Sequence, residues 1–214
     1  MSQPLFCLTG IFIKTILKIK DLNESIAMNE TVLKDLLIKT PEINEILKII
    51  DQLKLSDAWL CAGSIRNLIW NKLSGQPPFD PTTDIDVIFF DPEITYEATQ
   101  EIERTLQLAH PSYVWEVKNQ AHMHLHNPNT APYLSARDAM AKFPESCTAI
   151  GARLTPTREI ELFLPYGLAA ITDFIVRPTP FFTENAEKLA IYRERQAKKN
   201  WQEKWPQLQI LSAD

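Results

Sequence analysis

The sequence predicts an α+β fold in which helices flank a mixed central β-sheet. Short apolar segments with strand character alternate with longer segments whose apolar residues recur at helical spacing. The chain has 214 residues, of which 45% are hydrophobic, and this is enough to build one core of ordinary size. We therefore expect one functional domain at residues 29–214, preceded by a peripheral leader at residues 1–28.

The first elements after the leader are expected to be two helices. Asn29 or Thr31 is a suitable cap for the first helix, which Pro41 interrupts. A second helix follows at residues 43–53, because its isoleucines and leucines recur every three or four positions.

A strand, a turn and a third helix come next. Residues 58–62 form the short strand, Gly63-Ser64 the turn, and residues 65–73 the helix. Proline-containing residues 76–83 predict a loop. The strand at 84–90 is apolar on both faces after its first residues, which suits an interior position in the sheet.

The second half of the chain predicts a further strand, a hairpin and several helices. In the strand at 113–119, apolar and polar residues alternate, so Glu116 and Lys118 point away from the buried face. The remaining expected elements are a helix at 95–108, a strand or short helix at 120–126, a helix at 135–143, a hairpin of 147–154 with 159–164, a helix at 168–174, an extended segment at 175–180, and a charged, solvated surface helix from 183 to 201 or beyond.

Composition narrows the class of function. The net charge of −5 argues against a dedicated nucleic-acid-binding protein. The three cysteines are far apart and form neither a disulfide framework nor a metal-binding spacing, so a cytoplasmic location is expected. No stretch is long and apolar enough to cross a membrane, and the apolar run at 5–13 has its lysines on the wrong side for a signal peptide.

Asp84 and Asp86 are the first candidates for chemistry. Residues i and i+2 of a strand point to the same face, so their carboxylates converge. Two like charges this close are unfavourable unless a cation lies between them, and Mg²⁺ prefers such oxygen ligands. The alternative is an ordinary solvated strand end beside a proline-rich loop.

Gly63-Ser64 is the second candidate. A small turn between a strand and a helix exposes backbone N–H groups where a phosphate can bind. Alternatively, Ser64 only caps the helix that follows. A strand–Gly-Ser–helix unit followed by an Asp-x-Asp strand is more specific than either motif alone.

Together these motifs resemble the polymerase-β-type nucleotidyltransferase superfamily, and the wider run resembles its bacterial nucleotidyltransferase-like family. The resemblance covers roughly residues 42–195 and is carried by the runs at 62–67, 83–87, 115–124 and 148–153. It implies a polymerase-β-like nucleotidyltransferase fold, two divalent metal ions, and transfer of a nucleoside monophosphate from an NTP to a hydroxyl or phosphate acceptor. The loop at 74–82 makes the spacing between the two motifs longer than is usual in the superfamily.

The superfamily also uses a third carboxylate, as metal ligand or as base for the acceptor. Glu116 is the first choice and Glu161 the rival, and both remain open from the sequence. The candidate cations for neutralising the phosphates are Arg66, Lys118 and Arg153.

The expected function is therefore a Mg²⁺-dependent nucleotidyltransferase that uses an NTP and acts on a small molecule or a protein, with nucleic acid an unlikely acceptor and no membrane partner. A non-catalytic nucleotide-binding or partner-binding module on the same fold is the alternative. A third hypothesis is a zinc site, because His122, His124 and His126 would share one face of a strand.

Overall fold

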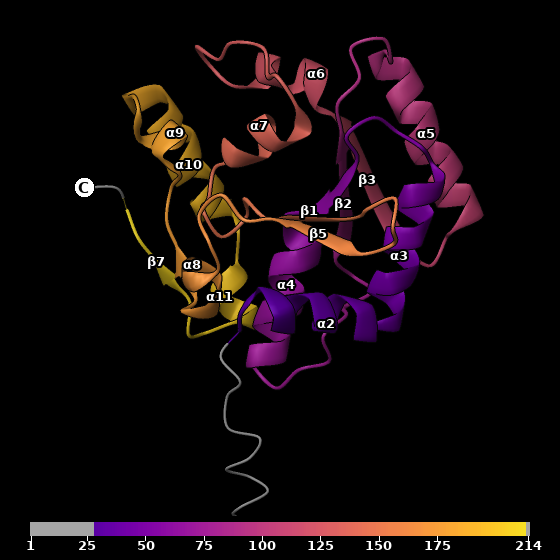
Figure 1. Cartoon of the computed structure of the whole chain (residues 1–214). Coiled ribbons are helices and arrows are strands. Elements are labelled where there is room, and N and C mark those ends of the chain that lie inside the picture. Colours follow the sequence, from indigo (N-terminus) through magenta and orange to yellow (C-terminus); the bar gives the residue numbers. More distant parts are fainter. Residues whose placement is uncertain (1–27, 213–214) are drawn as a thin grey trace, which may run out of the picture.

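The computed structural model of the protein describes residues 28–212 (Figure 1). The expected leader at 1–28 therefore lies outside the described residues, apart from Met28. The first helix, α2 (Glu30–Lys39), begins after Asn29, whose side chain accepts a hydrogen bond from the Val32 N–H. This is the capping geometry that the sequence indicates.

A five-stranded mixed sheet forms the centre of the fold, in the order β3-β2-β1-β4-β5. The strands are β1 (Trp59–Cys61), β2 (Asp84–Phe89), β3 (Val114–Asn119), β4 (Gly151–Leu154) and β5 (Ile160–Phe163). Only β2 and β3 run parallel, while β1 pairs antiparallel with both β2 and β4, and β4 with β5. The mixed sheet flanked by helices is thus confirmed, and β2 lies inside it as expected.

Three helices cover one face of this sheet: α3 (Pro41–Gln52), α4 (Gly63–Leu73) and α5 (Tyr96–Ala109). Ile85, Val87 and Phe89 of β2 are buried with Ile65 and Leu68 of α4 in the main apolar core. Figure 1 shows α4 beneath β1 and β2, and α5 beside β3. Since successive residues of a strand face opposite sides, Asp84, Asp86 and Ile88, which alternate with these apolar residues in β2, face the other side of the sheet.

That other face is only partly covered. Trp59, Cys61 and Ile88 pack there against Ala136 and Met140 of the short helix α7 (Ala136–Ala141). The remainder of this face, at the start of β2, is not covered by α7 and forms the wall of a pocket. Asp84 and Asp86 are part of its lining.

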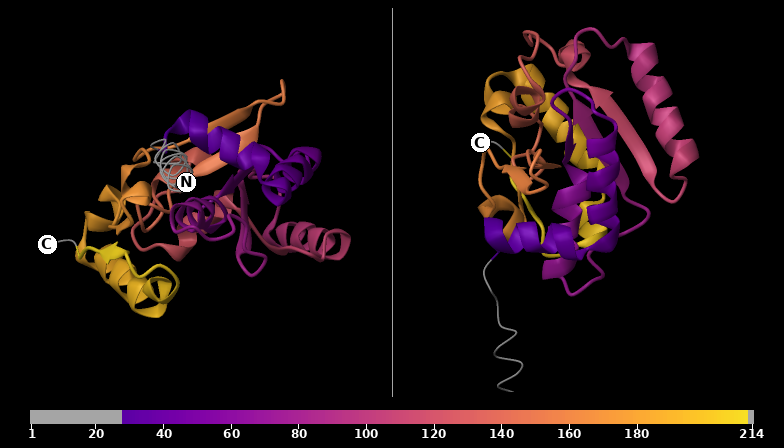
Figure 2. Two further views of the ribbon diagram at one scale, coloured as in Figure 1. Left: turned by 90° about the horizontal axis from the view of Figure 1, so that it is seen from below. Right: turned by 45° about the vertical axis from the view of Figure 1, so that its right-hand side comes forward.

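The charged surface helix expected from 183 to 201 is present but shorter, as α10 (Ala186–Lys198), and two of its residues, Lys188 and Tyr192, are buried. The C-terminal region is also divided into more elements than expected. It contains α8 (Ala169–Thr172), α9 (Pro180–Thr183), α10 and α11 (Trp201–Lys204), with β6 (Ile175–Val176) and β7 (Gln209–Ile210) paired in a second small sheet. Tyr192 is buried and its hydroxyl donates to the Leu211 carbonyl at 2.8 Å. The indole of Trp70 packs against those of Trp201 and Trp205, with ring centroids 5.8 and 5.0 Å apart. In the left view of Figure 2 the yellow segments α10, α11 and β7 lie on the opposite side of the molecule from α5.

Two further segments differ in detail. Residues 120–126 are helical, as α6 (Gln120–Met123) and the 3₁₀ helix η1 (His124–His126), so the three histidines do not alternate along a strand. The hairpin begins at Gly151 and not at Cys147. Within residues 28–212, no helix combines the length and apolarity needed to cross a membrane.

Candidate active site

The turn between β1 and α4 is strained. Ala62, the residue before the helix, has φ 51° and ψ −121°, a conformation that residues other than glycine rarely adopt. This conformation directs the Gly63 N–H at the Asp86 carboxylate, with 2.8 Å between the nitrogen and Oδ2. A Cβ atom added at Gly63 would lie 2.9 Å from the same oxygen, so the close approach requires glycine.

Ser64 joins the helix to β2. Its hydroxyl donates to the Asp84 carbonyl at 3.1 Å and accepts from the Asp86 N–H at 2.8 Å. The structure therefore uses the Gly63 N–H and the Ser64 hydroxyl to hold the aspartate strand. Ser64 does not cap the helix, because the cap residue is Ala62. Phosphate binding by the backbone N–H groups of this turn stays a prediction.

Three carboxylates lie on neighbouring strands at the open face. Asp84 and Asp86 are two residues apart on β2, and the parallel register places Asp86 beside Glu116 of β3. Glu116 also forms an ion pair with Lys118 at 3.5 Å. Burial, followed by repulsion from Glu116, raises the pKa of Asp86 to about 6, against attraction from Arg66.

Glu116 and Asp84 both repel the Asp86 carboxylate, and a cation bound between these groups would relieve that repulsion. Among residues 28–212 there is no group of three or more His, Cys, Asp or Glu side chains arranged to hold a metal ion. Mg²⁺ does not require such a group, since it commonly binds one or two carboxylates together with phosphate oxygens and water. Asp84 and Asp86 fit that donor set.

The zinc hypothesis depends on His122, His124 and His126. His122 directs Nε2 at the Ile94 carbonyl, 2.9 Å away, and the Nδ1 atom of His124 is buried. These helical histidines are not among any metal-binding group in the described part of the chain. The structure gives the zinc hypothesis no support.

Arg66 lies in the first turns of α4 and lines the same pocket as Asp84 and Asp86. Its guanidinium donates to the Thr148 hydroxyl at 2.8 Å and to the Asn67 side-chain carbonyl at 2.8 Å, and it stacks over the Trp201 ring at 4.2 Å. The side chain is buried and burial lowers the pKa of Arg66. Both of its hydrogen-bond acceptors are neutral, so its charge remains available to an anion.

Two pockets meet at Asp86 and Glu116. The larger, about 530 Å³, is polar and its walls include Arg66, Arg195 and Lys199. The smaller, about 320 Å³, is lined on its other side by Lys118 and by aromatic side chains, among them Tyr133 and Phe143. Besides Asp86 and Glu116, the two share Ala62, Thr148 and Arg195.

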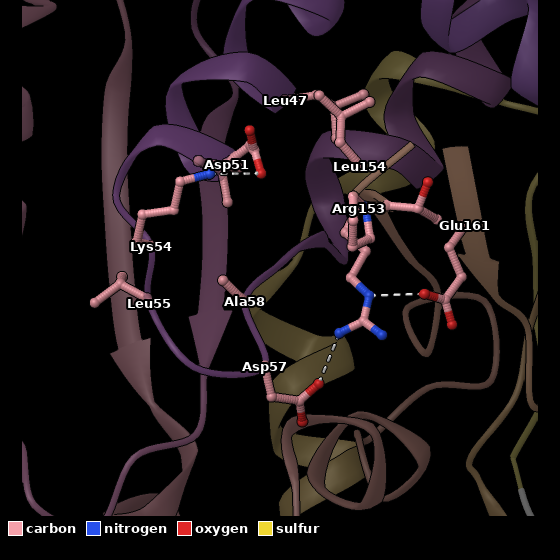
Figure 3. A pocket seen from close by; sticks show the side chains of 12 residues that line it. Leu47, Asp51, Lys54, Leu55, Asp57, Ala58, Arg153, Leu154 and Glu161 are labelled. Carbon is pink, nitrogen blue, oxygen red and sulfur yellow. Dashed lines mark hydrogen bonds and ion pairs between the residues drawn. The ribbon is translucent and has the colours of Figure 1, made fainter. Parts of the chain in front are cut away.

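Arg153 and Glu161 are placed elsewhere. Figure 3 shows them in a separate pocket of about 460 Å³, where the Arg153 guanidinium contacts Glu161 at 2.8 Å and Asp57 at 3.1 Å. Glu161 lies on the edge strand β5, with β4 and β1 between it and β2. The structure therefore brings Glu116, and not Glu161, beside the aspartates, and it brings Arg153 to neither of their pockets.

Several residues of the two shared pockets have no signal in the sequence. Arg195 and Lys199 belong to a charged segment that is typical of a solvated helix. Trp201 is typical of the apolar face of an amphipathic helix, so nothing in the sequence marks these three residues as part of a site. Thr148 lies in one of the runs that carry the superfamily resemblance, which is the only available indication. The loop at 74–82 contributes Asp80, which pairs with Lys204 of α11 beside the larger pocket.

Comparisons with known proteins show the family of this chain. A family model described as nucleotidyltransferase matches residues 48–210. A solved structure described as revealing a CCA-adding enzyme head domain is 50% identical, with a TM-score of 0.83 over 88% of this chain and 98% of its own. The Bacillus stearothermophilus CCA-adding enzyme in complex with CTP is 18% identical, with a TM-score of 0.44 over 72% of this chain and 38% of its own. No curated protein matches significantly in sequence.

Proposed function

We propose that this chain, which belongs to the nucleotidyltransferase family, transfers a nucleoside monophosphate from an NTP to an acceptor in a Mg²⁺-dependent reaction. The observation that carries the proposal is the strand register that pairs Asp86 with Glu116, with Asp84 on the same face of β2. The Gly63 N–H donates a hydrogen bond to the Asp86 carboxylate. Around this group lie a larger polar pocket and a smaller, more apolar one. A donor and an acceptor therefore have separate places on either side of one set of carboxylates.

The reaction requires charge neutralisation and proton removal. When bound by Asp84 and Asp86, Mg²⁺ would neutralise phosphate charge and orient the phosphate undergoing transfer. The acceptor oxygen forms a bond to the α-phosphorus, and the bond from that phosphorus to the oxygen bridging to the β-phosphorus breaks, so pyrophosphate leaves. Glu116 is assigned one of two roles: it accepts the proton of the acceptor hydroxyl, or it is a third ligand of the metal. Arg66 and Lys118 are assigned to the phosphates.

The acceptor is proposed to be a small molecule or a protein, in keeping with the acidic net charge. The likeness to a solved domain described as a CCA-adding enzyme head favours a second candidate, the terminal hydroxyl of a tRNA. A nucleotide-binding module without turnover is the alternative to both.

Pyrophosphate release distinguishes these proposals. Each of the four NTPs is supplied with Mg²⁺ and a panel of small-molecule, protein and tRNA acceptors, and wild type is compared with the Asp84→Ala/Asp86→Ala double variant. We expect Mg²⁺-dependent release by wild type and none by the variant. Equal metal and NTP binding by both proteins would sink the assignment of the aspartates. NTP binding without release on any acceptor would favour the binding module.

A further inference from the structure

Arg195 of α10 reaches the open face from a helix that the sequence suggests is solvated. It is among the few residues that line both pockets beside Asp86. Its side chain is 36% exposed, so it is neither fully buried nor free in solvent. A guanidinium at this junction can contact a substrate in either pocket.

The position of Arg195 is held by Glu145, which is fully buried. Arg195 donates through Nε to Glu145 Oε1 at 2.6 Å, and Gln196 donates to the same oxygen at 2.7 Å. The other carboxylate oxygen, Oε2, is buried and has no hydrogen-bond partner in the described part of the chain. A buried carboxylate must be compensated by a nearby cation, and Arg195 is the cation that contacts it.

The same backbone segment also holds Arg66. The Glu145 carbonyl accepts from the Thr148 N–H at 3.0 Å, and the Thr148 hydroxyl accepts from Arg66 at 2.8 Å. Residues 145–148 thus connect two arginines from distant parts of the chain. With Lys199 and Lys204, they give four cationic side chains to the lining of the larger pocket, which Asp84, Asp86 and Glu116 also line.

Only one edge of the Arg195 guanidinium is used by Glu145. In residues 28–212, neither terminal nitrogen donates to a protein oxygen. A guanidinium whose two terminal nitrogens are both unused matches a phosphate group, which accepts paired hydrogen bonds. Placing two arginines near one another is unfavourable in itself and becomes favourable when a polyanion lies between them.

We infer that Arg195 is a phosphate-binding residue for the pyrophosphate portion of the NTP in the larger pocket, and that Glu145 is its positioning residue. The inference rests on the proposed function for the identity of the ligand. It concerns binding, however, and is testable without turnover.

The test is titration calorimetry of the full chain with inorganic pyrophosphate and, separately, with an NTP. We expect Arg195→Gln to weaken pyrophosphate binding about tenfold or more, as for loss of a charge-assisted hydrogen bond, and Arg195→Lys to restore part of it. Arg104→Gln is the matched control, because Arg104 pairs with Glu101 on the exposed face of α5, away from both pockets. It should bind like wild type.

The role of Glu145 is tested in a double-mutant cycle. Glu145→Gln should weaken pyrophosphate binding in the wild-type background and add nothing in the Arg195→Gln background, because it acts only through Arg195. A purely structural Glu145 would lower thermal stability and weaken binding equally in both backgrounds. If Glu145→Gln does not fold, the two Arg195 variants still decide the main inference.

Unchanged pyrophosphate affinity in Arg195→Gln, or no pyrophosphate binding by wild type, would overturn the inference. Weaker NTP binding with unchanged pyrophosphate binding would also overturn it, by placing Arg195 at another part of the nucleotide. Failure of the proposed function gives a different result, namely normal pyrophosphate binding and no transfer to any acceptor.

Discussion

The backbone N–H of Gly63 and the carboxylate of Asp86 are joined by a hydrogen bond of 2.8 Å between residues 23 positions apart. This contact ties the start of α4 to the third residue of β2. It fixes one oxygen of Asp86, whose side chain is part of the lining of both pockets. The site residues that the two sequence motifs supply are therefore one unit, assembled by the turn at Ala62.

Gly63→Ala should disrupt this unit. The added Cβ would lie 2.9 Å from Asp86 Oδ2, so the carboxylate must move, and we expect the transfer rate to fall about 100-fold. The measurement is the rate of pyrophosphate release at saturating NTP. Gly75→Ala is the control: its Cβ meets nothing within 4 Å, but φ is +69°, so it should cost about 1 kcal/mol of stability and leave the rate unchanged. A normal rate for Gly63→Ala would contradict this account.

Asp86→Asn should abolish transfer without lowering stability. Asparagine can still accept from the Gly63 N–H, and it removes a buried charge that Glu116 repels. In metal-free buffer at neutral pH, we expect a midpoint of thermal unfolding equal to or above that of wild type, together with complete loss of pyrophosphate release. Both are measured on the same preparation. A large drop in the midpoint would mean that Asp86 has mainly a structural role.

Glu116 and Glu161 provide a matched pair of glutamates. Glu116→Gln should lower kcat by about 100-fold or more, as for loss of a general base or a metal ligand. Glu161→Gln should leave kcat unchanged and lower stability, because Glu161 partners Arg153 in the other pocket. Steady-state kinetics and thermal unfolding of the two variants check this. Equal losses of kcat would reopen the choice between them.

Asp80 and Lys204 tie the loop at 74–82 to α11. Burial would raise the pKa of Asp80, but hydrogen bonds from Lys204 and Thr82 outweigh it and lower the pKa to about 2. Because the folded pKa lies below the ordinary carboxyl value, the stabilisation is present above about pH 4 and disappears as the pH falls toward 2. Asp80→Asn should therefore be less stable than wild type at pH 7, and this difference should shrink below pH 4.

Urea unfolding across this pH range measures the Asp80 effect. Asp35→Asn is a suitable control, since Asp35 pairs with Lys39 on an exposed helix surface where such pairs contribute little. A stability difference for Asp80→Asn that stayed constant down to pH 3 would exclude the ion pair as its origin.

Much of the fold follows from local patterns in the sequence. The caps at Asn29, Thr95 and Ser135 form as their residue types indicate, because capping depends on side chains within three residues. The alternation along 113–119 places Trp115 inward and Glu116 outward for the same local reason. The C-terminal segment could not be predicted in this way, since its burial depends on contacts with Trp70 and Val176, which are remote in the chain.

Local patterns in the sequence are enough to pick out the two aspartates, the Gly-Ser turn and the strand–turn–helix context that they share, because spacing along a strand fixes which side chains share a face. The folded chain is needed to place Glu116 and not Glu161 beside the aspartates, to place Arg153 in another pocket, and to bring Arg195 near the carboxylates. Those choices depend on strand order and on packing of α10, which bring together residues separated by 30 to more than 100 positions. No local pattern carries that information.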